Sequence, residues 1–259
     1  MKIPELLQMP QSEFVMGALH APHPEDGEGP ERLITLSAYR ISATAVSNAE
    51  FAEFIQATGY RTAAEDRGRS QVFQGRLSDP EGHLKVSSTV PWWRWVDGAF
   101  WARPNGTDHA EPDHPVVHVN RTDVAAYCAW RGVRLPTEAE WENAATPQGA
   151  VAPHIWQGQF PDAPVSPPNT RAVQDAVPNA HGLYHSCGNV WEWVSDRFNR
   201  LHSPRPDRNP KGPLNGQTCV VKGGSYLCSP SYCARFRPSS RRQEVLNATT
   251  CHLGFRVAV

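Results

Sequence analysis

The pattern of hydrophobic and polar residues along the chain predicts a helix after Ser47. Ser47 and Glu50 form a capping box, apolar side chains then recur at helical spacing, and Gly59 ends the run. A second helix is predicted over residues 120–132 from the same spacing of apolar side chains. Asp123 in that helix is predicted to point outward.

A further capping box and several short apolar runs complete the pattern. Thr137 and Glu140 predict a third helix start, and capping accounts for the acids there better than a metal site does. Short strands are predicted over residues 14–17, 33–41, 182–184, 189–194, 220–225 and 254–259. The stretch from Tyr60 to His118 carries no regular signal, so a long loop is predicted. Its tryptophans would either pin that loop to the core or line a peptide-recognition wall.

Composition indicates much irregular backbone, since the chain has 24 prolines, 19 glycines and 9 tryptophans. A length of 259 residues suits one large domain over residues 1–259. The 25 Lys and Arg balance 26 Asp and Glu, so no global field draws the chain to nucleic acid or to an anionic membrane. No window approaches the roughly 20 apolar residues of a membrane span, and the first ten residues lack a signal-peptide core. A cytoplasmic protein is therefore predicted.

Candidate chemistry centres on the segment Lys222–Cys233, which carries two cysteines behind a Gly-Gly turn. Four residues separate Cys228 from Cys233, and Pro230 between them favours a turn that brings both sulfurs toward one point. Soft thiolates select Cu(I), zinc or an Fe–S cluster. Two thiolates with no third or fourth ligand nearby in the sequence suit Cu(I) best, since Cu(I) accepts a low coordination number. A disulfide, half of a zinc site and redox catalysis are the alternatives. Cys128, in the second predicted helix, is predicted to be a small buried residue.

Several motifs stand in the order found in the sulfatase-modifying-factor domain family. They are His114-Pro-Val-Val-His-Val, Ala126-Tyr-Cys-Ala-Trp130, Arg134-Leu-Pro-Thr-Glu-Ala-Glu-Trp-Glu142, Gly188-Asn-Val-Trp-Glu-Trp193, Lys222-Gly-Gly-Ser-Tyr226 and Leu253-Gly-Phe-Arg256. The chain resembles that family from about Phe14 onward. The resemblance implies an irregular, loop-rich α+β fold related to C-type lectins. Within the family, the segment Gly-Gly-Ser-Tyr-x-Cys-x4-Cys resembles the formylglycine-generating enzymes.

This narrower resemblance implies a copper-dependent oxidase that uses O2 to convert a peptidyl cysteine to Cα-formylglycine. It implies that Cys228 and Cys233 hold Cu(I) and that the substrate thiolate joins them as a third ligand. Ser225, Tyr232 and the Trp191 indole would help to position O2. The implied partner is a peptide or protein with a reactive cysteine, of the sulfatase type Cys-x-Pro-x-Arg or a divergent thiol. The chain is expected to be monomeric.

The resemblance also places the substrate peptide, in an extended conformation, beside Trp92 and Trp93. Arg69 stands where some relatives have an acid near the arginine of the substrate. A like charge there predicts poor turnover of Cys-x-Pro-x-Arg and a preference for an acidic residue at the arginine position, unless Arg69 points to solvent. The alternative function is a non-catalytic binding or immunity module on the same fold, in which the cysteine pair is residual.

Calcium is the second metal that the resemblance raises, since relatives carry two calcium sites. His154 replaces an asparagine ligand of the first site, so that site is expected to be absent. At the second site the resemblance implies backbone oxygens of Gly188 and Val190 and the Glu192 carboxylate as ligands, so at most one Ca2+ is expected. The half-cystines of animal relatives are missing, which is consistent with a bacterial cytoplasmic member.

Overall fold

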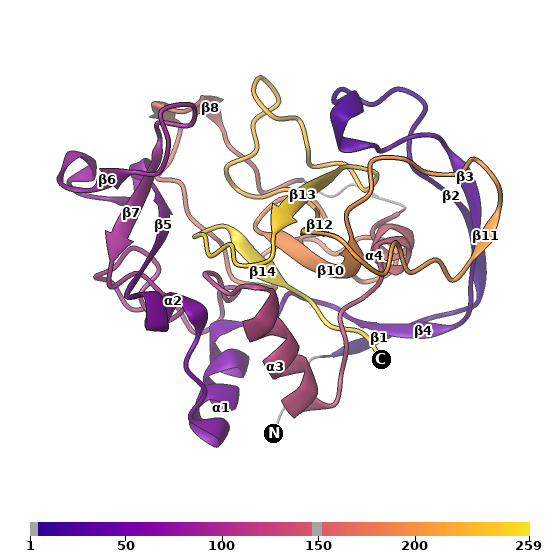
Figure 1. Ribbon diagram of the computed structural model, residues 1–259, viewed down its shortest axis with the longest axis horizontal. Coiled ribbons are helices and arrows are strands. Elements are labelled where there is room, and N and C mark those ends of the chain that lie inside the picture. Colours follow the sequence, from indigo (N-terminus) through magenta and orange to yellow (C-terminus); the bar gives the residue numbers. More distant parts are fainter. Residues whose placement is uncertain (1–4, 147–151) are drawn as a thin grey trace.

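The computed structural model describes residues 5–146 and 152–259 and has an α+β fold in which short elements alternate with long connections (Figure 1). The helices in the described ranges are α1 (Asn48–Thr58), α2 (Ala63–Arg67), α3 (Arg121–Arg131) and α4 (Glu138–Ala145), and the 3-10 turns are η1 (Pro24–Asp26), η2 (Gln74–Arg76) and η3 (Pro80–Gly82). Among these residues no helix is both long and apolar enough to cross a bilayer.

A four-stranded sheet lies at the centre of the fold, in the order β13-β12-β10-β14. Its strands are β10 (Trp191–Arg197), β12 (Thr218–Lys222), β13 (Arg241–Val245) and β14 (Leu253–Phe255). Strand β10 pairs antiparallel with β12 and parallel with β14. Two segments that are distant in sequence from each other therefore lie on either side of β10.

Smaller sheets surround the central one. They are β11-β3-β2, β5-β7-β6, β1-β4 and β8-β9, built from β1 (Leu6–Met9), β2 (Ser12–Met16), β3 (Arg32–Leu36), β4 (Tyr39–Ser42), β5 (Arg69–Phe73), β6 (Leu84–Lys85), β7 (Trp93–Asp97), β8 (Gly158–Gln159), β9 (Ala163–Pro164) and β11 (Asp207–Arg208). The strand predicted over residues 33–41 is thus two strands, since it covers most of β3 and most of β4 and the short connection between them. Residues 182–184 form no strand.

The predicted starts of helices α1, α3 and α4 are confirmed. Ser47 and Glu50 exchange both capping-box hydrogen bonds at the start of α1, and Thr137 and Glu140 do the same at α4. These motifs lie within four residues of chain, and for that reason the sequence alone locates them.

The prediction that Asp123 points outward is wrong, because its side chain is fully buried. One carboxylate oxygen accepts the Asn120 amide, which completes the capping box of α3. The other oxygen accepts the Tyr60 hydroxyl at 3.1 Å and the Ala63 amide at 3.0 Å. Asp123 therefore fixes the start of α2 against α3.

The prediction of a structureless loop from Tyr60 to His118 is also wrong in part, since α2, β5, β6 and β7 lie within it. Thr62 and Glu65 form a capping box at α2. Strand β5 pairs antiparallel with β7, whose residues follow twenty or more positions later, so the pairing leaves no local signal. Trp101 packs against the central hydrophobic cluster, as a loop anchor would.

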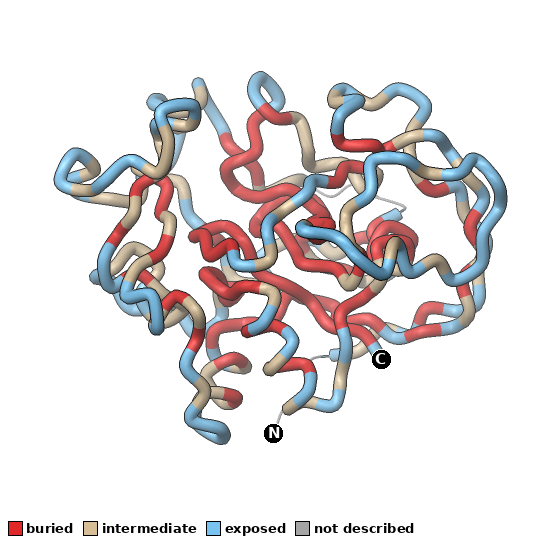
Figure 2. The backbone as a smooth tube through the Cα atoms, in the orientation of Figure 1, coloured by how far each residue is buried: buried red, intermediate tan, exposed pale blue. Residues whose placement is uncertain are grey.

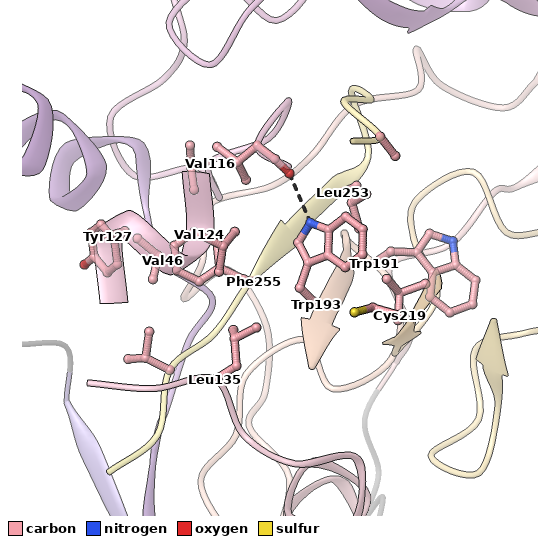
Figure 3. Packing of buried hydrophobic residues seen from close by; sticks show 14 of the residues in the cluster. Val46, Val116, Val124, Tyr127, Leu135, Trp191, Trp193, Cys219, Leu253 and Phe255 are labelled. Atoms are coloured by element: carbon pink, nitrogen blue, oxygen red, sulfur yellow. Dashed lines mark hydrogen bonds between the residues drawn. The ribbon is translucent and has the colours of Figure 1, made fainter. Parts of the chain in front are cut away.

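Buried residues concentrate on the central sheet and on the helices that face it (Figure 2). Trp191 and Trp193 both project from β10 into the main hydrophobic cluster, together with Cys219 of β12 (Figure 3). The Trp193 indole donates to the Val119 carbonyl at 3.0 Å, which ties the sheet to the segment before α3. Strand β10 is therefore a rigid base for the residues that extend from it.

Candidate active site

The Lys222-Gly-Gly turn at the end of β12 sets the course of the cysteine segment. Lys222 is fully buried, and its ammonium lies 2.8 Å from the Glu142 carboxylate of α4. Gly223 and Gly224 both have positive φ, and a Cβ on Gly224 would lie 2.5 Å from the Arg235 carbonyl oxygen. Only glycine fits this second position, so the turn sends the chain from the end of β12 directly into the cysteine loop.

The two cysteines of the loop converge, as their spacing predicts. Both are buried free thiols, so the disulfide alternative is not formed. The Ser225 amide donates to the Cys228 sulfur at 3.4 Å. A hydrogen bond between the two thiols raises the pKa of Cys228 and lowers the pKa of Cys233. Cys233 therefore carries the thiolate of the pair, which is the form that binds soft metals.

A cavity of about 480 Å³ opens beside the two sulfurs. Its lining includes the predicted site residues Trp92, Trp93, Trp191, Ser225, Cys228, Tyr232 and Cys233. It also includes Phe160, Arg242 and His252, which the sequence did not single out. Its volume lies in the range of cavities that bind small ligands or short side-chain segments.

One wall of this cavity is aromatic. The Tyr232 ring stacks on Phe160 with centroids 4.6 Å apart, and the Trp92 ring stands edge-on to both, 5.3 Å from Phe160 and 5.4 Å from Tyr232. Tyr232 is half exposed, so the wall extends from the cysteines to the surface. These rings form an apolar surface on which an entering chain segment can pack.

Ser225 and Trp191 lie deeper in the cavity. Ser225 is fully buried, and its hydroxyl oxygen accepts the Leu227 amide at 3.3 Å, which leaves the hydroxyl proton available to another acceptor. Trp191 is buried, with 3% of its surface exposed, and it lines the cavity. Among the described residues, none accepts a hydrogen bond from its indole nitrogen. Both side chains can therefore donate to a small molecule in the cavity.

Arg69 does not share this cavity. Its guanidinium lies over the Trp95 ring at 5.1 Å, and it begins strand β5 opposite Asp97 of β7. Gln71, two residues further along β5, lines the cavity instead. Of the three residues that the family resemblance places beside the substrate peptide, Trp92 and Trp93 line the cavity and Arg69 lies outside it.

Glu192, expected with Gly188 and Val190 to bind calcium, has partners within the protein core. The Glu192 carboxylate is buried, and both its oxygens accept hydrogen bonds from Arg256, at 2.6 and 2.8 Å. The Trp141 indole adds a third at 2.7 Å. A carboxylate already paired with a guanidinium is less available to a cation, so these contacts favour Glu192 as a core ion-pair partner, and the calcium site stays a prediction.

Replacing Glu192 by glutamine is therefore expected to lower the free energy of unfolding by about 3–5 kcal/mol, since the Arg256 charge stays buried without its partner. Urea denaturation in the presence of CaCl2 and again in the presence of EDTA measures this loss. The loss should be equal in the two buffers. A calcium-dependent stability that disappears in the Glu192→Gln variant would instead support the calcium assignment.

Comparison with known proteins agrees with the family motifs. Residues 1–259, the whole chain, match the family described as Sulfatase-modifying factor enzyme 1-like domain. The chain belongs to this family. The sequence resemblance on which the cysteine pair was assigned is thereby confirmed at the level of the family.

Members of the sulfatase-modifying-factor family that resemble this chain include proteins with and without activity. A formylglycine-generating enzyme of Bos taurus is 42% identical and covers 98% of this chain and 74% of its own length. A Bos taurus protein named inactive Cα-formylglycine-generating enzyme 2 is 35% identical over 98% of this chain and 85% of its own. The structure of PvdO from Pseudomonas aeruginosa superposes with a TM-score of 0.70 at 22% identity, over 98% and 94% of the two chains, and supports the fold alone.

Proposed function

We propose that this chain oxidises a peptidyl cysteine to Cα-formylglycine, with O2 as the oxidant and Cu(I) held by Cys228 and Cys233. The observation that carries the proposal is the pair of reduced, buried thiols in mutual hydrogen-bond contact at the wall of a cavity. Two adjacent soft sulfur donors suit Cu(I) better than calcium, so the cysteine pair fits this metal. When bound, the metal supplies a site for the substrate thiolate and an electron for O2.

The reaction takes two hydrogens from the CH2–SH unit of the substrate, and water then replaces the sulfur to give the aldehyde and sulfide. Because O2 accepts more electrons than this unit donates, a thiol reductant supplies the remaining pair. Within the chain, the lowered pKa of Cys233 keeps a thiolate in the cavity near neutral pH. Ser225 and the Trp191 indole provide donors for a small polar molecule, and the aromatic wall excludes water around it.

The proposed substrate is a sulfatase-type protein segment that enters along the aromatic wall. Replacing Trp92 by alanine is expected to raise the KM for a Cys-x-Pro-x-Arg peptide about tenfold, because the edge-on contacts to Phe160 and Tyr232 are lost together with the packing surface. The kcat should change less than about twofold. Steady-state kinetics of peptide oxidation measure both constants.

Arg69→Ala is the matched control for this prediction, because Arg69 lies outside the cavity. Its KM for the same peptide should equal that of the wild type. A marked fall in KM for an arginine-containing peptide would show that Arg69 does read the substrate, as its position in the sequence suggested.

A non-catalytic binding module is the second candidate, and the similarity to a relative named inactive favours it. Dependence on O2 separates the two functions. An oxidase loaded with Cu(I) should form a hydrazide-reactive aldehyde on the peptide in air and none under anaerobic conditions. A binding module would retain the peptide under both conditions without forming an aldehyde.

A further inference from the structure

A second cavity, of about 330 Å³, lies behind β13 and shares no lining residue with the cysteine cavity. Arg242 lines the cysteine cavity and Arg241, its neighbour on β13, lines this one, in keeping with the alternation of side chains along a strand. Strand β3, the end of β10 and the connection that contains β11 complete its walls. The proposed oxidation makes no use of it.

The lining is rich in cationic side chains. It contains the basic residues Arg32, Arg197, Arg205, Lys211 and Arg241, the acidic residues Glu138, Asp196 and Asp207, and His202. Five formal positive charges therefore face three negative ones. Such an excess inside a concave surface attracts an anion.

Several of these cations lack an anionic partner. The Arg32 guanidinium donates only to the Pro30 carbonyl and to the Met16 sulfur, each at 3.3 Å, and no carboxylate in the described ranges pairs with it. Burial, the largest effect, lowers the pKa of Arg32. Arg205 before β11 and Lys211 after it are exposed, also without an ion pair to any described residue. A guanidinium in this state gains from a bidentate anionic ligand.

His202 supplies a second unpartnered donor. Its Nε2 atom is buried and has no hydrogen-bond partner in the structure as described. His202 lines the same cavity as Arg241 and Arg32. Burial lowers its pKa to about 4, and the charges of these two arginines lower it further. A buried imidazole nitrogen without a partner is costly unless a ligand or water fills the space beside it.

Two of the three acids in the lining are already engaged. Glu138 forms a two-pronged pair with Arg241, at 2.6 and 2.9 Å, and lies 3.7 Å from Lys222. Asp196 accepts the Glu138 amide at 2.8 Å, and burial raises its pKa to about 7. Asp207 is exposed and accepts the Arg208 amide at 2.7 Å, so its charge is screened by solvent and offsets that of Arg32 only in part. Arg32 and His202 therefore remain as free donors.

We propose that this cavity is a binding site for a tetrahedral oxyanion, of the phosphate or sulfate class, held between the Arg32 guanidinium and the His202 imidazole. Lys211 and Arg205 stand at its exposed side and attract the ion. The ligand is either the free ion or the same group in an ester, because the cavity is larger than one such ion requires.

Isothermal titration of the wild-type chain with sodium phosphate, with ionic strength held constant by NaCl, tests the site without any need for oxidase activity. We expect saturable binding of one ion per chain and at least a tenfold rise in Kd for Arg32→Gln. Arg208→Gln removes the same charge from an exposed position on β11 outside the lining, and its Kd should match the wild type. Lys211→Gln, at an exposed position that cannot disturb the core, should raise the Kd severalfold.

Parallel titrations with sulfate and with a phosphate monoester identify the source of the ligand. A lower Kd for the monoester points to an esterified phosphate and a lower Kd for the inorganic ions to the free ion; both results support the site. Equal Kd values for Arg32→Gln, Lys211→Gln and Arg208→Gln, or heat changes reproduced by NaCl alone, would overturn it. Failure of the cysteine pair to oxidise peptides would leave these titrations unaffected.

Discussion

Replacing Cys228 or Cys233 by serine is expected to weaken Cu(I) binding by at least about a hundredfold and to abolish peptide oxidation. Loss of partners around a metal site already costs about 10–100-fold in affinity, and loss of one of only two sulfur ligands should cost more. The Cys233→Ser variant also loses the thiol whose pKa is lowered, and it keeps only Cys228, whose buried thiol has a raised pKa. Competition with a Cu(I) chelator measures the affinity of each variant under reducing conditions.

Cys128→Ser is the matched control for this prediction. Cys128 is likewise a buried free thiol, but it lies in α3 and does not line the cysteine cavity. Its Cu(I) affinity and a stoichiometry of one ion per chain should equal those of the wild type. Unchanged affinity in both Cys228→Ser and Cys233→Ser would place the copper ligands elsewhere and remove the basis of the proposed mechanism.

Acidification from about pH 7.5 to about pH 5 is expected to destabilise the fold by several kcal/mol, because buried histidines are held neutral. Burial lowers the pKa of His118 to about 3 and of His185 and His202 to about 4, and it also lowers the pKa of His252. Each would take up a proton near pH 6.5 once unfolded. Stability is therefore fully present above that pH and is lost as the pH falls toward the folded value.

His118 provides the cleanest test, since its side chain is fully buried. At about 1.4 kcal/mol per pH unit, its share of the loss at pH 5 is about 2 kcal/mol. Urea denaturation at both pH values should show a smaller acid-induced loss for His118→Gln than for the wild type. His109→Gln, at an exposed position, should keep the full loss. An equal loss in both variants would show that His118 does not hold its neutral form by burial.

The sequence predicts the parts of this fold whose causes are local. A capping box joins residues three positions apart, so the starts of α1 and α4 can be read from Ser47 and Thr137. Helical periodicity placed Asp123 outside, because its decisive partners, Tyr60 and Ala63, come from about sixty residues earlier. Strands β5 and β7 escaped prediction for the same reason, since their signal is the pairing itself.

The candidate site shows the same division. Cys228 and Cys233 lie five positions apart on one loop, so their spacing alone indicates shared chemistry. Phe160 and His252 reach the cavity through tertiary contacts and stand in no recognisable motif. The ion pair of Glu192 is invisible to local sequence, because its partner Arg256 lies 64 positions later in the chain. Local sequence shows which residues carry reactive groups, and long-range packing decides which groups are still available for a ligand.

The most direct test of the proposed function is the mass of a Cys-x-Pro-x-Arg peptide after incubation with the Cu(I)-loaded chain, O2 and a thiol reductant. The proposal predicts a product in which the cysteine CH2–SH unit has become an aldehyde, with no such product from the Cys233→Ser variant. An unaltered peptide after incubation with a wild-type chain that carries one Cu(I) would contradict the proposed oxidation.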